Sequence, residues 1–216
     1  MECIQGKYSL HIDRAELDRR LAAYSAAHID IGTGDGRFAL DAARRRPDLF
    51  VIGLDACRDS VREASRRAPA NVLFVVANVA DLPAELAGRA SGLSVNFPWG
   101  SLLKALISDE PAVLDGLVGL GRPGFRLELM VNGEALATLG SSLERGGAQI
   151  RRGLIRRGLD VAEPAILDRA ALRAIPTTWA RRLAFGRDPR ALYCQASRPA
   201  AAPAVAWEEL ALGVGA

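Results

Sequence analysis

The stretch of residues 28–37, H-I-D-I-G-T-G-D-G-R, constrains the fold of this chain more than any other. Two isoleucines flank Asp30, glycines follow at Gly32, Gly34 and Gly36, and an amphipathic run begins after them. This order is typical of a first strand, a tight turn and a helix N-terminus, where α/β sheets bind nucleotide-like ligands. The stretch therefore predicts an α/β fold with a ligand site at the end of its first strand.

Short apolar runs alternate with amphipathic segments along the rest of the chain. The predicted strands cover residues 27–31, 50–54, 71–76, 93–97, 125–131, 159–167 and 191–197. Most of these runs are continuously apolar, which is what burial on both faces of a parallel sheet requires. The sequence predicts a Rossmann-like α/β fold, with a seven-stranded, mostly parallel sheet and helices on both faces.

The chain divides into an N-terminal extension (1–26), a main α/β domain (27–197) and an Ala/Pro-rich tail (198–216). The extension is predicted to hold a short strand or hairpin arm and a helix capped by Asp13. In the main domain we expect a turn at 121–124, a polar connection at 140–147, a basic helix at 149–158 and a basic loop at 176–187. The tail is expected to be partly disordered, with a short helix around 207–212.

Composition excludes several classes of protein. The chain has 216 residues, half of them hydrophobic, which suits one large domain. It has no apolar run long enough to span a membrane and no signal peptide pattern, so a cytoplasmic protein is expected. Its cysteines (Cys3, Cys57 and Cys194) fit neither a disulfide framework nor a zinc spacing, and no metal site is predicted.

Positive charge is concentrated in one part of the chain. Residues 144–187 contain ten arginines and four acidic residues, whereas the whole chain carries a net charge of only +3. Such clustering favours a polyanionic partner. The alternative is an arginine-rich genome, since the only lysines are Lys7 and Lys104. That alternative explains the choice of arginine better than it explains the clustering.

The glycine spacing points to a particular ligand. A dinucleotide-binding turn reads G-x-G-x-x-G, whereas this turn reads G-x-G-x-G, as in methyltransferases that use S-adenosylmethionine. Asp30 suits the cationic methionine end of that cofactor, and Asp55, after the second strand, suits the ribose hydroxyls. Another nucleotide, or none, remains the alternative. The predicted cofactor-binding residues in this part of the chain are Asp30, Gly32, Thr33, Gly34, Asp55, Ala77, Asn78, Asp81 and Asn96.

The fourth predicted strand ends in Asn96, Phe97, Pro98 and Trp99. This tetrapeptide resembles the [D/N/S]-P-P-[Y/F/W] signature of enzymes that methylate nitrogen on planar bases. Its backbone could orient a base while Trp99 stacks on it, although Trp99 could equally be a core aromatic residue. Trp179 lies among arginines in the basic loop, and two tryptophans could enclose one extruded base.

Three motifs together resemble one family. They are H-I-D-I-G-T-G-D-G-R, F-P-W-G-S-L-L at 97–103 and T-T-W-A-R-R-L-A-F-G-R at 177–187. The chain resembles, over about residues 4–198, the 16S rRNA (adenine(1408)-N(1))-methyltransferases that confer kanamycin–apramycin resistance. The resemblance implies that Trp99 and Trp179 enclose the flipped adenine and that Thr177 supports the cofactor side. It also implies that Arg182 and Arg187 hold rRNA phosphates near the flipped nucleotide. The other predicted RNA-binding residues are Arg66, Arg67, Arg151 and Arg152.

The reaction that the resemblance implies needs no general base. Adenine N1 has an in-plane lone pair and no proton to remove, so alignment and exclusion of water suffice. The chain departs from the family in a short linker at 66–70 with only two charges, and in Ala80, where the family often has Glu. A monomer acting on 16S rRNA in the 30S subunit is expected. The alternatives are a related methyltransferase for another RNA or a small molecule, and a catalytically weak cofactor-binding RNA module.

Overall fold

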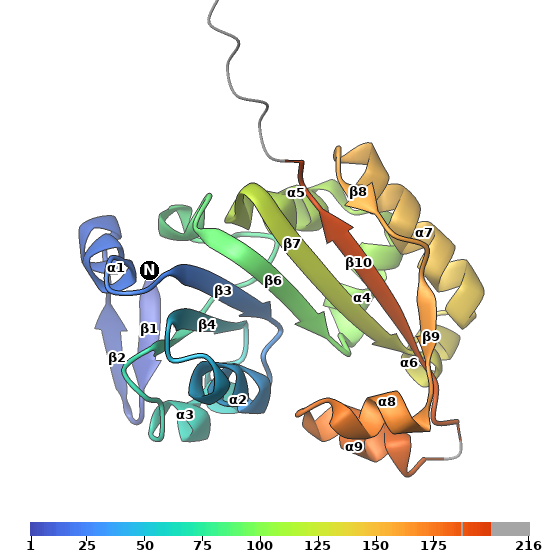
Figure 1. The fold of residues 1–216 in the computed structure, drawn as a ribbon, viewed down its shortest axis with the longest axis horizontal. Coiled ribbons are helices and arrows are strands. Elements are labelled where there is room, and N and C mark those ends of the chain that lie inside the picture. The colour runs from blue at the N-terminus through green and yellow to red at the C-terminus, as the bar shows by residue number, and fades with distance from the viewer. Residues whose placement is uncertain (187, 200–216) are drawn as a thin grey trace, which may run out of the picture.

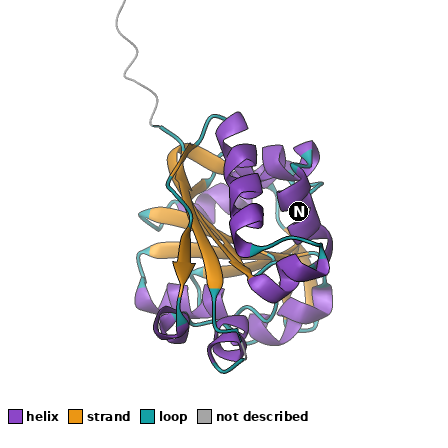
Figure 2. Ribbon diagram, turned by 90° about the vertical axis from the view of Figure 1, so that its right-hand side faces the viewer, coloured by secondary structure: helices purple, strands orange, loops and turns teal. Residues whose placement is uncertain are grey.

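A computed structural model describes residues 1–186 and 188–199. Its strands form one twisted sheet in the order β2-β1-β5-β4-β3-β6-β7-β10-β8, and β9 also pairs with β10 (Figures 1 and 2). The strands are β1 (Glu2–Gln5), β2 (Tyr8–His11), β3 (Ala26–Ile31), β4 (Leu49–Asp55), β5 (Val72–Val76), β6 (Ala90–Asn96), β7 (Gly121–Asn132), β8 (Asp160–Val161), β9 (Ala165–Leu167) and β10 (Ala191–Ser197).

The five central strands β3 to β7 are parallel, which confirms the predicted fold class. Strand β3 lies in the middle, between β4 and β6. The chain leaves β3 toward β4 and β5, and after β5 it crosses back to β6 on the other side of β3. This reversal opens a crevice beyond the carboxyl end of β3. That crevice is where open α/β sheets bind their ligands.

Helices cover both faces of the sheet. In Figure 1, α2 and α3 lie in front of the sheet, and α4 and α5 are seen behind it. The described residues form three apolar clusters, one under α2 and α3, a larger one on the opposite face and a small one between α8, α9 and the ends of β6 and β7. The α-helices are α1 (Arg14–Leu21), α2 (Arg37–Arg45), α3 (Arg58–Ser65), α4 (Gly100–Ser108), α5 (Pro111–Leu120), α6 (Gly133–Thr138), α7 (Leu143–Arg156), α8 (Arg169–Ala174) and α9 (Thr178–Ala184).

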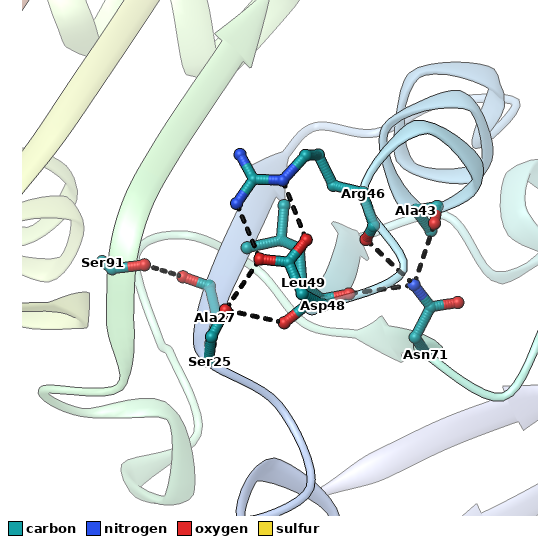
Figure 3. Close-up of polar contacts among 8 residues, drawn as sticks. All are labelled: Ser25, Ala27, Ala43, Arg46, Asp48, Leu49, Asn71 and Ser91. Carbon is teal, nitrogen blue, oxygen red and sulfur yellow. Dashed lines mark hydrogen bonds and ion pairs between the residues drawn. The ribbon is translucent and has the colours of Figure 1, made fainter.

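A buried amide fixes the connection between α2 and β4 (Figure 3). The side chain of Asn71 donates hydrogen bonds to the carbonyls of Ala43 and Leu49, at 3.0 and 2.9 Å. Carbonyls in the last turn of a helix lack partners within the helix, so Asn71 satisfies groups that would otherwise be buried unpaired. The contact sets the position of α2 and, with it, of the glycine turn before α2.

The predicted number of strands is wrong, because the antiparallel edges of the sheet are longer than expected. At the N-terminus, β1 and β2 form a hairpin that joins β5. At the other edge, the predicted strand at 159–167 is two short strands, β8 and β9, that both pair with β10. Pro164 lies between them, and a proline has no N–H to give to a sheet.

The predicted connection at 140–147 is also wrong in its second half. Helix α7 begins after Ser142, whose hydroxyl accepts a hydrogen bond from the N–H of Arg145. Gly146 and Gly147 are therefore helical. A Cβ on Gly146 would lie 2.7 Å from the side chain of Leu136, so these glycines serve close packing and not a turn.

Two further predicted loops belong to regular elements. The basic loop at 176–187 contains α9, and α8 precedes it; Thr177 and Asp168 cap these helices by accepting N–H bonds. The turn predicted at 121–124 lies within β7, as an irregularity in its pairing with β6. Residues 187 and 200–216 lie outside the described part of the chain, as do the helix expected at 207–212 and nearly all of the predicted tail.

Candidate active site

A pocket of about 480 Å³ lies at the carboxyl ends of β3, β4 and β6, beneath α9. A volume of this size is typical of small-ligand sites. It brings together most of the residues predicted from the sequence. Those that line it are Asp30, Gly32, Thr33, Gly34, Asp55, Ala77, Asn96, Phe97, Pro98, Trp99, Thr177, Trp179 and Arg182.

The glycines of the turn have different tasks. All three have positive φ, a conformation that favours glycine. A Cβ on Gly34 would meet open space, so the backbone is accessible to a ligand there. A Cβ on Gly36 would lie 2.6 Å from the Cβ of Ala64 and 2.8 Å from Phe74, so Gly36 lets α2 approach α3 and β5. The turn thus combines a ligand-facing residue with a packing residue.

Asp30 is buried and held by three donors. Its carboxylate accepts hydrogen bonds from Thr33 (2.6 Å), Ser94 (2.7 Å) and Asn96 (2.9 Å). Asp30 pairs with Ser94 in the parallel register of β3 and β6, which is why the hydroxyl reaches it. Burial raises the pKa of Asp30 to about 6, although the three hydrogen bonds oppose that rise. A cationic ligand beside Asp30 would favour the ionised form.

His28 supports this cluster from the buried side. Its Nε2 lies 2.9 Å from Ser94 Oγ, and burial lowers the pKa of His28 to about 4, which keeps the ring neutral. Because Ser94 donates to the carboxylate of Asp30, its oxygen can accept from Nε2–H of His28. A Cβ on Gly92 would lie 2.7 Å from the ring, so this glycine makes room for the histidine.

Asp55 is arranged as an acceptor at the end of β4. One carboxylate oxygen accepts from the N–H of Gly34 and the other from the N–H of Cys57, both at 2.8 Å. Each oxygen keeps a second lone pair, so the carboxylate can still accept two hydroxyl groups. The glycine turn and the predicted ribose-binding acid therefore hold each other in place.

Asn96 carries an unsatisfied acceptor. Its amide nitrogen donates to Asp30, whereas its Oδ1 is buried and has no partner among the described residues. An unpaired buried carbonyl is costly unless a ligand satisfies it. Together with the free lone pairs of Asp55 and the open backbone at Gly34, this acceptor fits a ligand that has N–H donors, a hydroxylated ribose and a positive charge. S-adenosylmethionine has all three.

The tetrapeptide after β6 has an unusual backbone. Phe97 has a φ of +54°, which is rare for a bulky residue and costs on the order of 1–3 kcal/mol. Its side chain is buried against Met130, Leu172 and Ala180, which holds this conformation. Phe97 therefore anchors the segment from below, while Trp99 is left at the pocket mouth.

Trp99 and Trp179 lie against each other. Their ring centroids are 5.3 Å apart with an interplanar angle of 34°, and each residue is 37% exposed. A base stacked between two rings needs a separation of about 7 Å, twice the 3.4 Å stacking distance. The guanidinium of Arg182 lies 5.2 Å from the Trp179 ring centroid, a cation–π contact. The structure thus shows the aromatic pair closed on itself.

Sequence reasoning missed the link between α9 and the glycine turn. The hydroxyl of Thr178 donates to the carboxylate of Asp35 at 2.6 Å, and both residues line the pocket. It also missed Ser94 as a partner of Asp30, together with part of the apolar wall, Phe38 and Leu102. The strand register predicts the Ser94 contact once β3 and β6 are known to be neighbours; nothing local in the sequence indicates the Thr178 contact.

Other predicted residues lie elsewhere. Asn78 and Asp81 pair with each other in a turn and are not among the described residues that line the pocket. Arg66 and Arg67 follow α3 directly and pair with Glu63, and Arg151 lies in α7 and pairs with Glu163. Arg152 is on the same helix, away from the pocket. Arg187 lies outside the described residues.

The described residues show neither a metal site nor a membrane-spanning helix. They contain no group of three or more His, Cys, Asp or Glu side chains placed to hold a metal ion. Within the same part of the chain, no helix combines the length and apolarity needed to cross a membrane.

The sheet has the parallel order β5-β4-β3-β6-β7, with β10 antiparallel beside β7. A glycine turn follows β3, and an acidic residue ends β4. This combination defines a class I S-adenosylmethionine-dependent methyltransferase. A family model, NpmA: 16S rRNA (adenine(1408)-N(1))-methyltransferase, matches residues 2–198. The chain belongs to this 16S rRNA (adenine(1408)-N(1))-methyltransferase family.

Individual relatives agree with the family model. The chain is 30% identical to the 16S rRNA (adenine(1408)-N(1))-methyltransferase of Streptoalloteichus hindustanus, over 87% of this chain and 94% of that protein. It is 34% identical to the antibiotic-resistance methyltransferase Kmr, with a TM-score of 0.78 over 94% and 100% of the two chains. A mutant 16S rRNA (adenine(1408)-N(1))-methyltransferase from Catenulisporales acidiphilia, solved with the cosubstrate SAM, has 26% identity and a TM-score of 0.81, with 95% and 100% covered.

Proposed function

We propose that this chain methylates N1 of the adenine at position 1408 of 16S rRNA, in the decoding site of the 30S subunit. S-adenosylmethionine is the donor, and the modification confers resistance to kanamycin and apramycin. The observation that carries this proposal is the contact of Trp99 with Trp179 at the mouth of the pocket that Asp30, Asp55 and Asn96 line. The protein acts as a cytoplasmic monomer in this proposal.

The cofactor site has a defined task for each polar residue. Asp30 and the Asn96 carbonyl face the cationic methionine end, and Asp55 accepts the ribose hydroxyls. Ala77 and Val79 form an apolar wall for the adenine ring. When bound, S-adenosylmethionine supplies an electrophilic methyl group on its sulfonium.

The acceptor side needs no general base, because the attacked N1 carries a lone pair and no proton. Trp99 and Trp179 hold the flipped adenine by stacking, orient its N1 toward the methyl group and exclude water. The product base is cationic, and facing indole rings stabilise it by cation–π attraction. Since the rings lie 5.3 Å apart, they must separate before a base can enter.

The test is incubation of the protein with tritiated S-adenosylmethionine and isolated 30S subunits, followed by primer extension, which N1 methylation blocks. We expect a stop at the decoding-site adenine. Trp99→Ala and Trp179→Ala should reduce labelling roughly 5- to 150-fold, since stacking contributes about 1–3 kcal/mol per base. Tyr8→Ala, an exposed aromatic residue on the distant strand β2, is the matched control.

Each alternative has a distinct result. A stop at another position, or labelling of free RNA only, would replace the proposed target. Cofactor binding without labelling would identify a catalytically inactive RNA-binding module. Expression in a susceptible bacterium tests the resistance separately, by the minimal inhibitory concentrations of kanamycin and apramycin, with the double variant Trp99→Ala/Trp179→Ala as the impaired control.

A further inference from the structure

A separate groove lies between α2 and residues 176–181, where α9 begins. This basic groove has a volume of about 290 Å³, and its walls are Arg37, Leu40, Asp41 and Arg44 of α2 with Pro176, Thr177 and Arg181. Thr177 lines the active-site pocket as well, so one residue separates the two cavities. Anything bound in the groove therefore lies beside the segment that carries Trp179.

The groove holds more positive than negative charge. Arg37 and Arg44 are seven residues apart on α2, which places them on the same helix face. The single acidic wall residue, Asp41, pairs with Arg45 at 2.8 Å, and Arg37 lies 3.3 Å from Asp35. Arg44 and Arg181 are exposed and form no ion pair within residues 1–186 and 188–199. Two guanidinium groups are thus available to an anion.

The walls also indicate which anion fits. Leu40 and Pro176 are apolar but not aromatic, so the described part of the groove offers no aromatic ring on which a base could stack, and charge is its main feature. Guanidinium groups match phosphate oxygens in charge and in fork geometry. In an RNA whose base enters the neighbouring pocket, backbone phosphates are the anions that remain outside it.

We propose that the basic groove binds a backbone phosphate of the rRNA strand next to the flipped adenine, through Arg44 and Arg181. This inference rests on the proposed function. The bound phosphate fixes the strand beside Thr177, so that the extruded base meets Trp99 and Trp179. The contact increases the affinity for the RNA and fixes the position of the strand on the protein, and it takes no part in methyl transfer.

The experiment compares two double variants of the full chain in binding isolated 30S subunits across a range of salt. Arg44→Ala/Arg181→Ala removes the two groove charges, and Arg14→Ala/Arg122→Ala removes two exposed charges near the amino ends of the parallel strands. We expect only the groove variant to lower the slope of log affinity against log salt, by about 0.7–0.9 per contact. Its KM for 30S subunits should rise roughly tenfold at physiological salt, with the S-adenosylmethionine Kd unchanged.

A third variant, Arg44→Lys/Arg181→Lys, keeps the charges and should recover most of the slope. Equal losses in the groove and control variants would overturn the proposal, because they would reflect net charge alone. A groove variant with unchanged slope and KM would overturn it too. The two failures are distinguishable. If the proposed function is wrong, the unsubstituted protein does not methylate 30S subunits; if only the groove proposal is wrong, methylation occurs and the slope of log affinity against log salt is the same in the groove variant.

Discussion

The hydroxyl of Thr178 and the carboxylate of Asp35 form a 2.6 Å hydrogen bond between residues 143 positions apart in the sequence. It joins the helix that carries Trp179 to the turn that faces the proposed cofactor. Thr178→Val should loosen α9 and raise the KM for 30S subunits about three- to tenfold, as expected for one partly exposed, charge-assisted hydrogen bond. Steady-state kinetics with tritiated cofactor measure this, and Thr178→Ser, which keeps the hydroxyl, should behave like the unsubstituted chain.

The proposed contact of Asp30 with a cationic cofactor predicts a pH dependence. The pKa of Asp30 is raised to about 6, so the carboxylate is ionised above that pH and increasingly protonated below it. Affinity for S-adenosylmethionine should therefore fall about tenfold per pH unit below pH 6, as measured by isothermal titration calorimetry. In Asp30→Asn this dependence should disappear; a curve of unchanged shape would assign the titration to another group.

The same shift has a consequence for stability of the unliganded protein. The folded state holds the Asp30 proton more tightly than the unfolded state, whose ordinary value is 3.8. The contribution of Asp30 to the free energy of unfolding is therefore greatest below pH 4 and is lost as the pH rises to about 6. Asp30→Asn should accordingly unfold no more easily than the unsubstituted chain at pH 7.5, while binding the cofactor at least tenfold more weakly.

Ser94→Ala tests the support that Asp30 receives from its neighbouring strand. Loss of the 2.7 Å hydrogen bond removes a donor that stabilises the carboxylate, so the pKa of Asp30 should rise further. The midpoint of the pH dependence of cofactor affinity should then move above pH 6. Ser91→Ala, which removes a hydroxyl bonded to the Ala27 carbonyl on the same pair of strands, should leave the midpoint in place.

Gly36 and Gly34 should respond differently to alanine, although both have positive φ. Alanine at Gly36 would meet Ala64 and Phe74 at under 3 Å, and overpacking with the left-handed backbone costs about 2–4 kcal/mol. The melting temperature should fall by roughly 5–15 °C. Alanine at Gly34 meets no neighbour, so it should lower the melting temperature by only a few degrees but weaken cofactor binding.

The sequence was sufficient to predict the parallel core and the convergence of three polar residues at one end of it. Apolar runs in β3, β4 and β6 mark buried strands, and the residues that follow them meet at one edge of the sheet, so Asp30, Asp55 and Asn96 could be placed together. Local capping also allowed the start of α1 at Asp13 to be predicted. These features depend on residues close in sequence and on general rules for parallel sheets.

Features that depend on distant contacts could not be predicted in this way. Gly146 and Gly147 suggested a turn, because their neighbours Leu136 and Leu192 are unknown until the chain folds. The segment around Trp179 looked like a loop, since its helix is short and packs on Phe97 and Met130. The closed contact of Trp99 with Trp179 required the position of α9, which the sequence alone leaves open.

The segment that connects β9 to β10 has its two ends side by side, because Leu167 and Ala191 are paired in the sheet. Strands β9 and β10 are seen next to each other in Figure 1. Both α8 and α9 lie in this connecting segment, whereas Asp30, Asp55 and Asn96 belong to the central strands. A segment whose two ends are neighbours in space can be exchanged for another without a change in the order of the strands. Residues proposed to hold the acceptor, such as Trp179 and Arg182, can thus change within one continuous stretch of sequence, while the central strands that carry Asp30, Asp55 and Asn96 stay as they are.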